Sequence, residues 1–339
     1  MNTILNYFKD KDGNIPIFSA SPKRRIVTPI RTNDDGIQWL KEIPEVATAS
    51  IRTDVFSNPP YFRRLLVGLK EKKIKTLIPR QGWRWIDLSN VKVISCWSKD
   101  YELFIREYEK PESVLHDIPL FMFNFTINGD SDECVLENIK TSLDVRFNQL
   151  KWLINSFGSD CINVRFDPIT HWLENGVEKN NLDEFLTVLE GIETLEVKQL
   201  SFSFCIDHNK VTRRMARHNK PLVIKTLEEK HNILRWMMEE AKNRDIILRA
   251  CCDDGFVGFE HNETKIAKSI CVDREIVARL LSDKGFVFGQ ASRGNRPQCA
   301  CVKNTDIFGY EICSNACLYC YANPHERAVK REVELEDIK

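Results

Sequence analysis

The chain has 339 residues, which is enough for one large α/β domain or two ordinary ones. Lys plus Arg and Asp plus Glu both total 49, and this zero formal charge argues weakly against non-specific binding of nucleic acid, which depends on neutralising phosphates. No stretch is apolar enough to span a bilayer and no secretory signal is visible, so we expect no membrane partner and a cytoplasmic location.

Residues 1–45 are of mixed composition with scattered Gly and Pro, and they predict an N-terminal extension with little regular structure. From residue 46 onward, short β-rich runs alternate with longer helical patterns, which predicts a parallel sheet joined by crossover helices. The expected strands are 46–51, 75–79, 91–97, 120–127, 161–166, 199–206 and 246–251, and the expected helices are 136–156, 182–189, 227–242 and 274–281.

About seven or eight such units fit a (β/α) barrel of TIM type, complete, partial or circularly permuted. A doubly wound open sheet is the alternative. The corresponding division of the chain is an extension at 1–45, a barrel at 46–290, and a cysteine-rich cluster segment at 291–339 that packs on the barrel rim.

Polar side chains follow most of the predicted strands. Because the carboxyl ends of barrel strands converge on one rim, which carries the active site in this fold, we expect a site there. The alternative for each residue is a structural ion pair or a helix cap. The charged candidates are Arg52, Asp54, Lys99, Arg165 and Asp167, and the hydroxyl candidates are Ser50, Thr126 and Ser203.

Five of the twelve cysteines lie within residues 292–323, and clustered thiols in a chain without an export signal favour a soft metal. Cys313, Cys317 and Cys320 form a C-x3-C-x2-C run. Three thiolates can hold three irons of a cubane cluster and leave the fourth iron open. The alternative is structural zinc, which needs four ligands, such as Cys299, Cys301, Cys317 and Cys320.

The triplet, with Tyr319 before the last cysteine, resembles the signature of radical S-adenosylmethionine (SAM) enzymes. That resemblance implies a [4Fe-4S] cluster whose open iron binds SAM, a barrel scaffold, a radical reaction on an unknown substrate, and a reductant protein such as flavodoxin or ferredoxin. The triplet of those enzymes ordinarily follows the first strand, whereas this one lies near the C-terminus, which a circular permutation could explain. A strand at 307–312 would then enter the cluster loop and a helix at 321–336 would leave it. The alternative is a C-terminal cap over the rim.

From about residue 49 to residue 323, the chain resembles the bacterial family called domain of unknown function 1848. The segments that carry this resemblance are Ser50-x-Arg52-Thr53-Asp54, Trp97-Ser98-Lys99, Phe123-x-Phe125-Thr126, Arg165-Phe166-Asp167-Pro168-Ile169, Asn295-Arg296-Pro297-x-Cys299-x-Cys301 and Cys313 to Asn323. Members usually carry Arg at position 51, Pro at 56 and His at 315, where this chain has Ile51, Phe56 and Asn315. The family implies the cofactor and the fold but no substrate.

A second site is suggested by Cys251, Cys271, Cys299 and Cys301, four thiols that could hold another iron–sulfur cluster or zinc. The alternative is that the first two are small buried hydrophobes. We expect Cys96, Cys134, Cys161 and Cys205 to be packing residues, and Cys252 is additional to the family pattern.

Three functions remain open on the sequence: a radical SAM-like enzyme, an iron–sulfur redox or sensor protein that does not cleave SAM, and a zinc-stapled binding module. In the first, Arg52, Asp54, Lys99, Arg165 and Asp167 bind SAM or substrate and Tyr319 shields the cluster. Nucleic acid would enter in the third through two basic runs, which we otherwise expect to be solvated. They are Lys70, Lys72, Lys73 and Lys75, and Lys210, Arg213, Arg214, Arg217 and Lys220.

Overall fold

The computed structural model describes residues 36–40, 43–78, 82–129, 136–289, 298–309 and 313–322. Most of the predicted extension at 1–45, the Asn295-Arg296-Pro297 segment, Cys134 and the helix expected at 321–336 lie outside these residues, apart from the first two positions of that helix.

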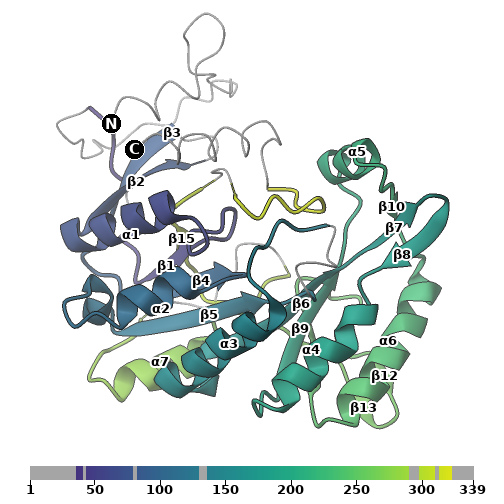
Figure 1. Cartoon of the computed structure of the whole chain (residues 1–339). Helices are drawn as coiled ribbons and strands as arrows, with labels where there is room; N and C mark the ends of the chain where they lie inside the picture. The colour runs from purple at the N-terminus through teal and green to yellow at the C-terminus, as the bar shows by residue number, and fades with distance from the viewer. Residues whose placement is uncertain are drawn as a thin grey trace, which may run out of the picture.

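The fold is a mixed α/β structure built on one large parallel sheet (Figure 1). Each neighbouring pair of its eight strands is parallel, which confirms the prediction drawn from the strand–helix alternation. In spatial order the strands are β14 (Ala267–Lys268), β11 (Ile247–Ala250), β9 (Gln199–Phe204), β6 (Ile162–Ile169), β5 (Leu120–Thr126), β4 (Val93–Ser98), β1 (Val46–Ala49) and β15 (Thr305–Asp306).

The strands follow one another across the sheet in chain order, except that the last, β15, lies beside the first, β1. A doubly wound sheet reverses its order part-way, whereas in a barrel the last strand returns to the first. Within the described residues, however, β14 and β15 are not paired, so these strands do not form a closed barrel. We call the space between these two unpaired edges the sheet gap.

Helices connect the strands. They are α1 (Pro59–Glu71), α2 (Glu102–Tyr108), α3 (Leu143–Phe157), α4 (Asp183–Glu193), α5 (Asn209–Arg217), α6 (Leu227–Lys242) and α7 (Arg274–Ser282), with 3-10 turns η2 (Val114–Asp117) and η3 (Ser159–Cys161). Among the described residues, none of these helices has the length and apolar character required to cross a membrane.

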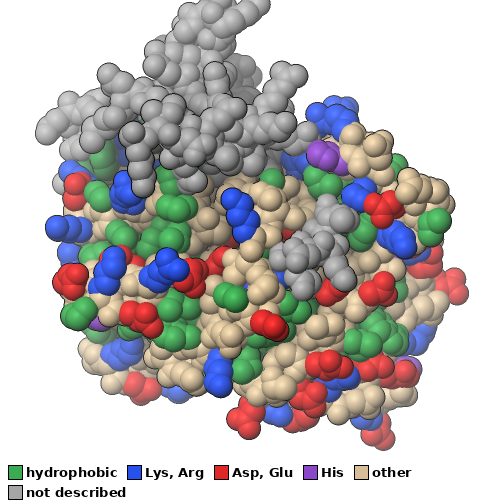
Figure 2. Space-filling model, in the orientation of Figure 1, with side chains coloured by type: hydrophobic (Ala, Val, Ile, Leu, Met, Phe, Trp, Pro, Cys, Tyr) green, Lys and Arg blue, Asp and Glu red, His purple; other side chains and the backbone are tan. Residues whose placement is uncertain are grey.

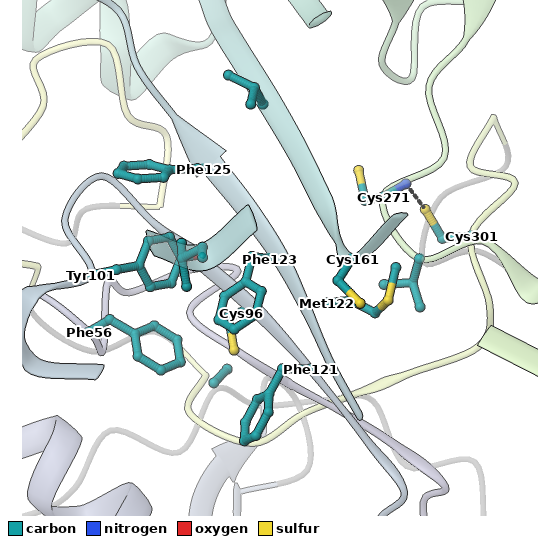
Figure 3. Close-up of a cluster of buried hydrophobic side chains, with 14 of the residues drawn as sticks. Phe56, Cys96, Tyr101, Phe121, Met122, Phe123, Phe125, Cys161, Cys271 and Cys301 are labelled. Carbon is teal, nitrogen blue, oxygen red and sulfur yellow. Dashed lines mark hydrogen bonds between the residues drawn. The ribbon is translucent and has the colours of Figure 1, made fainter. Parts of the chain in front are cut away.

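The two faces of the sheet differ because successive side chains of a strand point to opposite sides. On one side of β5, Phe121 and Phe123 pack against Phe104 of α2, with ring centroids 5.1 and 5.0 Å apart. Figure 3 shows these phenylalanines on one side of the strand, and Cys271 and Cys301 on the other.

The second face carries a row of buried polar side chains, in which hydrogen bonds join neighbouring strands. Asn163 Nδ2 donates to Asn124 Oδ1 at 2.8 Å, Ser201 Oγ donates to Asn163 Oδ1 at 2.7 Å, and the Ser201 and Ser269 hydroxyls are 2.7 Å apart. Because buried polar groups are stable only when they are paired, this row fixes the relative positions of β5, β6 and β9.

The structure corrects two of the predicted elements, one in its pairing and one in its first residue. The predicted strand 75–79 is β2 (Lys73–Ile78), which pairs with β3 (Gly82–Asp87) in a separate antiparallel hairpin and not in the main sheet. The helix predicted at 136–156 begins at Leu143, because the Ser142 side chain accepts a hydrogen bond from the Val145 N–H and caps it. Smaller pairings join β7 (His171–Glu174) to β8 (Val177–Asn180) and β10 (Leu222–Val223), and β12 (Glu260–His261) to β13 (Thr264–Lys265).

Candidate functional site

The three cysteines of the C-terminal triplet lie in one loop, residues 313–320, which we call the triplet loop. Cys320 is close enough to contribute to the raised pKa of both Cys313 and Cys317, so the three side chains lie in one neighbourhood. Burial raises the pKa of Cys313 to about 12 and that of Cys317 well above its usual value. In the part of the chain that the structure describes, no three His, Cys, Asp or Glu side chains are already arranged as a metal site.

Backbone hydrogen bonds give the triplet loop its shape. The Ala316 N–H donates to the Cys313 carbonyl at 3.2 Å, and the Cys320 N–H donates to the Cys317 carbonyl at 3.1 Å. The segment before α3 runs beside the loop, because the Leu318 N–H donates to the Leu136 carbonyl at 2.8 Å. The residues that sequence reasoning had placed in the first turns of a helix thus form one wall of the site.

Arg214 of α5 fastens the loop from the other side. Its side chain is buried, and Nη1 donates to the carbonyls of Cys320 at 2.6 Å and of Cys317 and Leu318 at 3.3 Å each. One guanidinium group therefore donates hydrogen bonds to three backbone carbonyls at and between the last two cysteines. The sequence placed Arg214 in a solvated basic run, and that expectation is wrong for this residue.

Asp54, which follows β1, joins the strand ends to the triplet loop. Its carboxylate accepts hydrogen bonds from Ser98 Oγ at 2.8 Å, from the Lys99 N–H at 3.0 Å and from Asn315 Nδ2 at 2.8 Å. The N–H groups of Phe56 and Ser57 also donate to it, each at 3.1 Å. Burial raises the pKa of Asp54, although these donors oppose the shift. Its oxygens are already occupied, which favours a positioning role over ligand binding.

A second polar group surrounds Tyr319. Lys99 Nζ lies 2.9 Å from Glu137 Oε1, and the exposed fractions of the two side chains are 12% and 1%. The Tyr319 hydroxyl donates to the same carboxylate oxygen, and Asn128 Nδ2 donates to it at 2.9 Å. Burial acts to raise the pKa of Glu137, but Lys99 and these donors hold it below its usual value.

Arg165 and Asp167 lie within β6, which extends beyond the predicted strand end to Ile169. The Arg165 guanidinium pairs with the Asp167 carboxylate, which also accepts a hydrogen bond from Ser203 Oγ at the end of β9. The strand pairing shifts register between Phe166 and Ile169, and such an irregularity re-aims the side chains beside it. Asn128 Oδ1 accepts from the Asp167 N–H at 2.8 Å, so this pair joins the group around Tyr319.

The remaining rim candidates are less closely connected. Arg52 pairs with Asp306 of β15 at 2.8 Å, so it links the first strand to the last. Ser50 Oγ accepts from the Val55 N–H at 2.8 Å and shapes the loop after β1. Thr126 lies at the end of β5, opposite Arg165 in the strand register.

The predicted second group of cysteines also comes together. The thiols of Cys251 and Cys271 interact with each other, and Cys301 interacts with Cys271 and Cys299. Cys252 belongs to the group as well, since its thiol interacts with Cys251 and Cys299. These five residues, the five-cysteine group, form a closed ring of neighbouring thiols. The sequence indicated four of them.

Of the other cysteines that the structure describes, Cys96 and Cys161 belong to the main core and Cys205 packs against the apolar cluster that contains Cys317. Cys96 and Cys161 are buried, and burial raises the pKa of Cys161 to about 11 and that of Cys205 to about 12.

On the visible face of the molecule, acidic and basic side chains are interspersed, and basic ones gather near α5 (Figure 2). Lys210, Arg213 and Arg217 are exposed there.

Sequence reasoning missed four side chains that hold the site together: Asn128, Glu137, Arg214 and Asn315. Asn128 directly follows a predicted strand and could have been included by the rule that selected its neighbours. Glu137 was hidden by the early helix start. Nothing local marked the contacts of Arg214 and Asn315, because their partners are far away in the sequence.

Comparison with known proteins identifies a family for this chain. The model of a protein family described as Domain of unknown function (DUF1848) matches residues 46–322. No significant match was found among curated proteins or solved structures.

Proposed function

Because this chain belongs to the DUF1848 family, whose model spans both the sheet and the triplet loop, we propose that it is an iron–sulfur protein that resembles radical SAM enzymes. Cys313, Cys317 and Cys320 would hold a [4Fe-4S] cluster with one open iron, and SAM would bind there for a reaction on an unknown substrate. The observation that carries this proposal is the fastening of the triplet loop to the ends of three neighbouring strands, β1, β4 and β5.

The donor set fits the cluster. Three thiols with no fourth cysteine in the same loop match a cubane with one open position. The backbone N–H groups of Asp54 and Asn315 act to lower the pKa of Cys313, but burial outweighs them. Since burial otherwise disfavours the charged form, a bound metal would supply the charge that these thiolates need.

The protein side chains would place and enclose the reactants. A reduced cluster of this type supplies the electron that cleaves the sulfonium of SAM. Tyr319 of the triplet loop would shield the cluster. Its hydroxyl is held by Glu137 and Asn128, and Lys99 Nζ lies 5.8 Å from its ring centroid. Lys99, Arg165 and Arg52 are cations suited to a carboxylate, each now paired with an acidic residue that a ligand would have to displace.

We further propose that the sheet is a partial, circularly permuted barrel. The triplet of radical SAM enzymes follows a first strand, and here β15 precedes the triplet loop and lies beside β1. Residues 46–290 would form the scaffold, 291–339 the cluster segment, and 1–45 an extension. The chemistry requires a reducing compartment such as the cytoplasm, and a reductant protein such as flavodoxin or ferredoxin.

The test is anaerobic reconstitution of the full chain with iron and sulfide, followed by reduction with dithionite in the presence of SAM. We expect the cluster signal in electron paramagnetic resonance to change when SAM is added, and deoxyadenosine and methionine to form. A variant in which Cys313, Cys317 and Cys320 are all replaced by Ala should lose both results. Cys96→Ala is the control, because Cys96 is a fully buried cysteine that lies among the aromatic side chains shown in Figure 3.

The alternatives predict other results from the same sample. A redox or sensor protein would bind iron and sulfide and respond reversibly to reduction, but SAM would change nothing. A zinc-stapled module would contain zinc and no inorganic sulfide. Either result would overturn the radical SAM proposal.

A further inference from the structure

The five-cysteine group lies at the sheet gap. Cys251 and Cys252 follow β11, Cys271 follows β14, and Cys299 and Cys301 precede β15. These segments are the two ends of the open sheet. Two hydrogen bonds join them: the Val302 N–H donates to the Val272 carbonyl at 3.0 Å, and the Cys271 N–H donates to Cys301 Sγ at 3.1 Å (Figure 3).

A buried cation lies against this group of thiols. Arg165 is buried, and its Nη1 donates to Cys271 Sγ at 3.2 Å, while Cys251 lies near the same guanidinium. A buried guanidinium with a single carboxylate partner would be complemented by an anionic cluster held by these cysteines.

The Nε atom of Arg165 adds an independent observation. It is buried and has no hydrogen-bond partner among the described residues. A buried N–H without an acceptor costs free energy, so an acceptor that the protein atoms do not supply would stabilise this side chain. Inorganic sulfide of an iron–sulfur cluster is such an acceptor, whereas a lone zinc ion brings none.

We propose that Cys251, Cys271, Cys299 and Cys301 ligate a second iron–sulfur cluster that joins the two ends of the sheet, with Cys252 as a fifth thiol beside it. Cys251 and Cys271 contact Arg165, and Cys299 and Cys301 supply the opposite side from the segment that leads to β15. A cubane takes four thiolates, so one member of the ring is dispensable. Cys252 is expected to be that one, since it adjoins Cys251 in the chain and the thiols with which it interacts most strongly are those of Cys251 and Cys299.

The proposal does not depend on SAM chemistry, because the two sites share no cysteine. The experiment measures iron, acid-labile sulfide and zinc per chain after anaerobic reconstitution. With both sites filled, we expect about eight irons in the parent protein, about four when Cys313, Cys317 and Cys320 are all replaced by Ala, and about four in Cys271→Ser/Cys301→Ser. Cys161→Ala is the control, because that buried thiol lies near the same face but outside the ring, and it should leave the iron content unchanged.

The two sites fail in distinguishable ways. If the parent protein and Cys271→Ser/Cys301→Ser hold the same amount of iron, or if the triplet variant holds zinc without sulfide, the second cluster is refuted. If the triplet variant retains all the iron of the parent protein, the first site fails and the second stands. Cys252→Ser should keep the full iron content, and a loss as large as that of Cys271→Ser/Cys301→Ser would show that Cys252 is a ligand in place of one of the four.

A readout of structure separates ligation from packing. Loaded protein should resist limited proteolysis in residues 298–309, and Cys271→Ser/Cys301→Ser should lose that protection while the triplet variant keeps it. Equal cleavage of loaded and metal-free parent protein would refute the proposed role at the sheet gap.

Discussion

The buried ion pair between Lys99 and Glu137 allows a quantitative test of the rim. At 2.9 Å and an effective dielectric constant of about 20, the attraction between two unit charges is about 6 kcal/mol before desolvation is subtracted. The Glu137→Gln substitution keeps the shape and the hydrogen bonds to Tyr319 and Asn128 but leaves the Lys99 ammonium without its counter-charge. Loss of one partner of a buried pair costs about 3–5 kcal/mol, and because Gln keeps the neutral hydrogen bonds we expect about 3 kcal/mol.

The measurement is the free energy of unfolding of the metal-free protein in urea, monitored by tryptophan fluorescence. Variants are compared when the slope of this free energy against urea concentration is the same. A double-mutant cycle with Lys99→Met isolates the pair. Removing both charges also removes the unpaired ammonium, so the double variant should be less destabilised than the sum of the two single variants by about 1–3 kcal/mol. The control is Glu102→Gln, since Glu102 pairs with Arg106 on the surface and should contribute less than about 1 kcal/mol.

Two results would refute this reasoning. If Glu137→Gln is no more destabilising than Glu102→Gln, the pair is not effectively buried. If the effects of Glu137→Gln and Lys99→Met simply add, the two charges do not interact in the folded protein.

Three further predictions concern the same region. Arg214→Met should lower iron retention by the triplet loop in gel filtration of the reconstituted protein, because three loop carbonyls lose their donor, whereas Arg213→Met on the exposed side of α5 should not. Gly309→Ala should lower the stability by at least about 2 kcal/mol in urea, since φ is +69° and the new Cβ would lie 2.5 Å from the Leu77 carbonyl oxygen, while Gly176→Ala, with open space around it, should cost only about 1 kcal/mol. The pKa of Glu137 is lowered in the folded protein, so its contribution to stability is complete above its ordinary pKa of 4.5 and is lost as the pH falls through the folded value. The loss of stability caused by Glu137→Gln should therefore become smaller in acid. A loss that becomes larger there would contradict the assignment.

The sheet was predictable because its strands are nearly continuous apolar runs separated by helical patterns. The runs that begin at 46, 91, 120, 161, 199 and 246 all belong to it. The run at 75–79 has the same composition but pairs in a hairpin, and local composition cannot distinguish these cases because the difference lies in the partner strand. The two-residue strands β14 and β15 carry too little pattern to be recognised, although they define the sheet gap.

The site was predictable to the extent that it follows strand ends and cysteine spacing. Those two rules found Asp54, Lys99, Arg165 and four members of the five-cysteine group. They could not assign partners, since the Asp54–Asn315 and Arg214–Cys320 contacts join residues 261 and 106 positions apart. Cys252 directly follows the predicted strand 246–251, but it was left out of the predicted set because it is additional to the family pattern.

Arg165 is the residue through which the two cysteine sites are connected. Its guanidinium pairs with Asp167, stacks 4.7 Å above the Trp97 ring and donates to Cys271, while the Asp167 backbone leads through Asn128 to Tyr319 in the triplet loop. A lysine at this position would keep the charge but could not contact the carboxylate, the ring and the sulfur at once, because its single ammonium lacks the planar fork. The rim therefore requires the geometry of arginine as well as its charge, and a change in the charge of the five-cysteine group would be transmitted first to the Arg165–Asp167 pair.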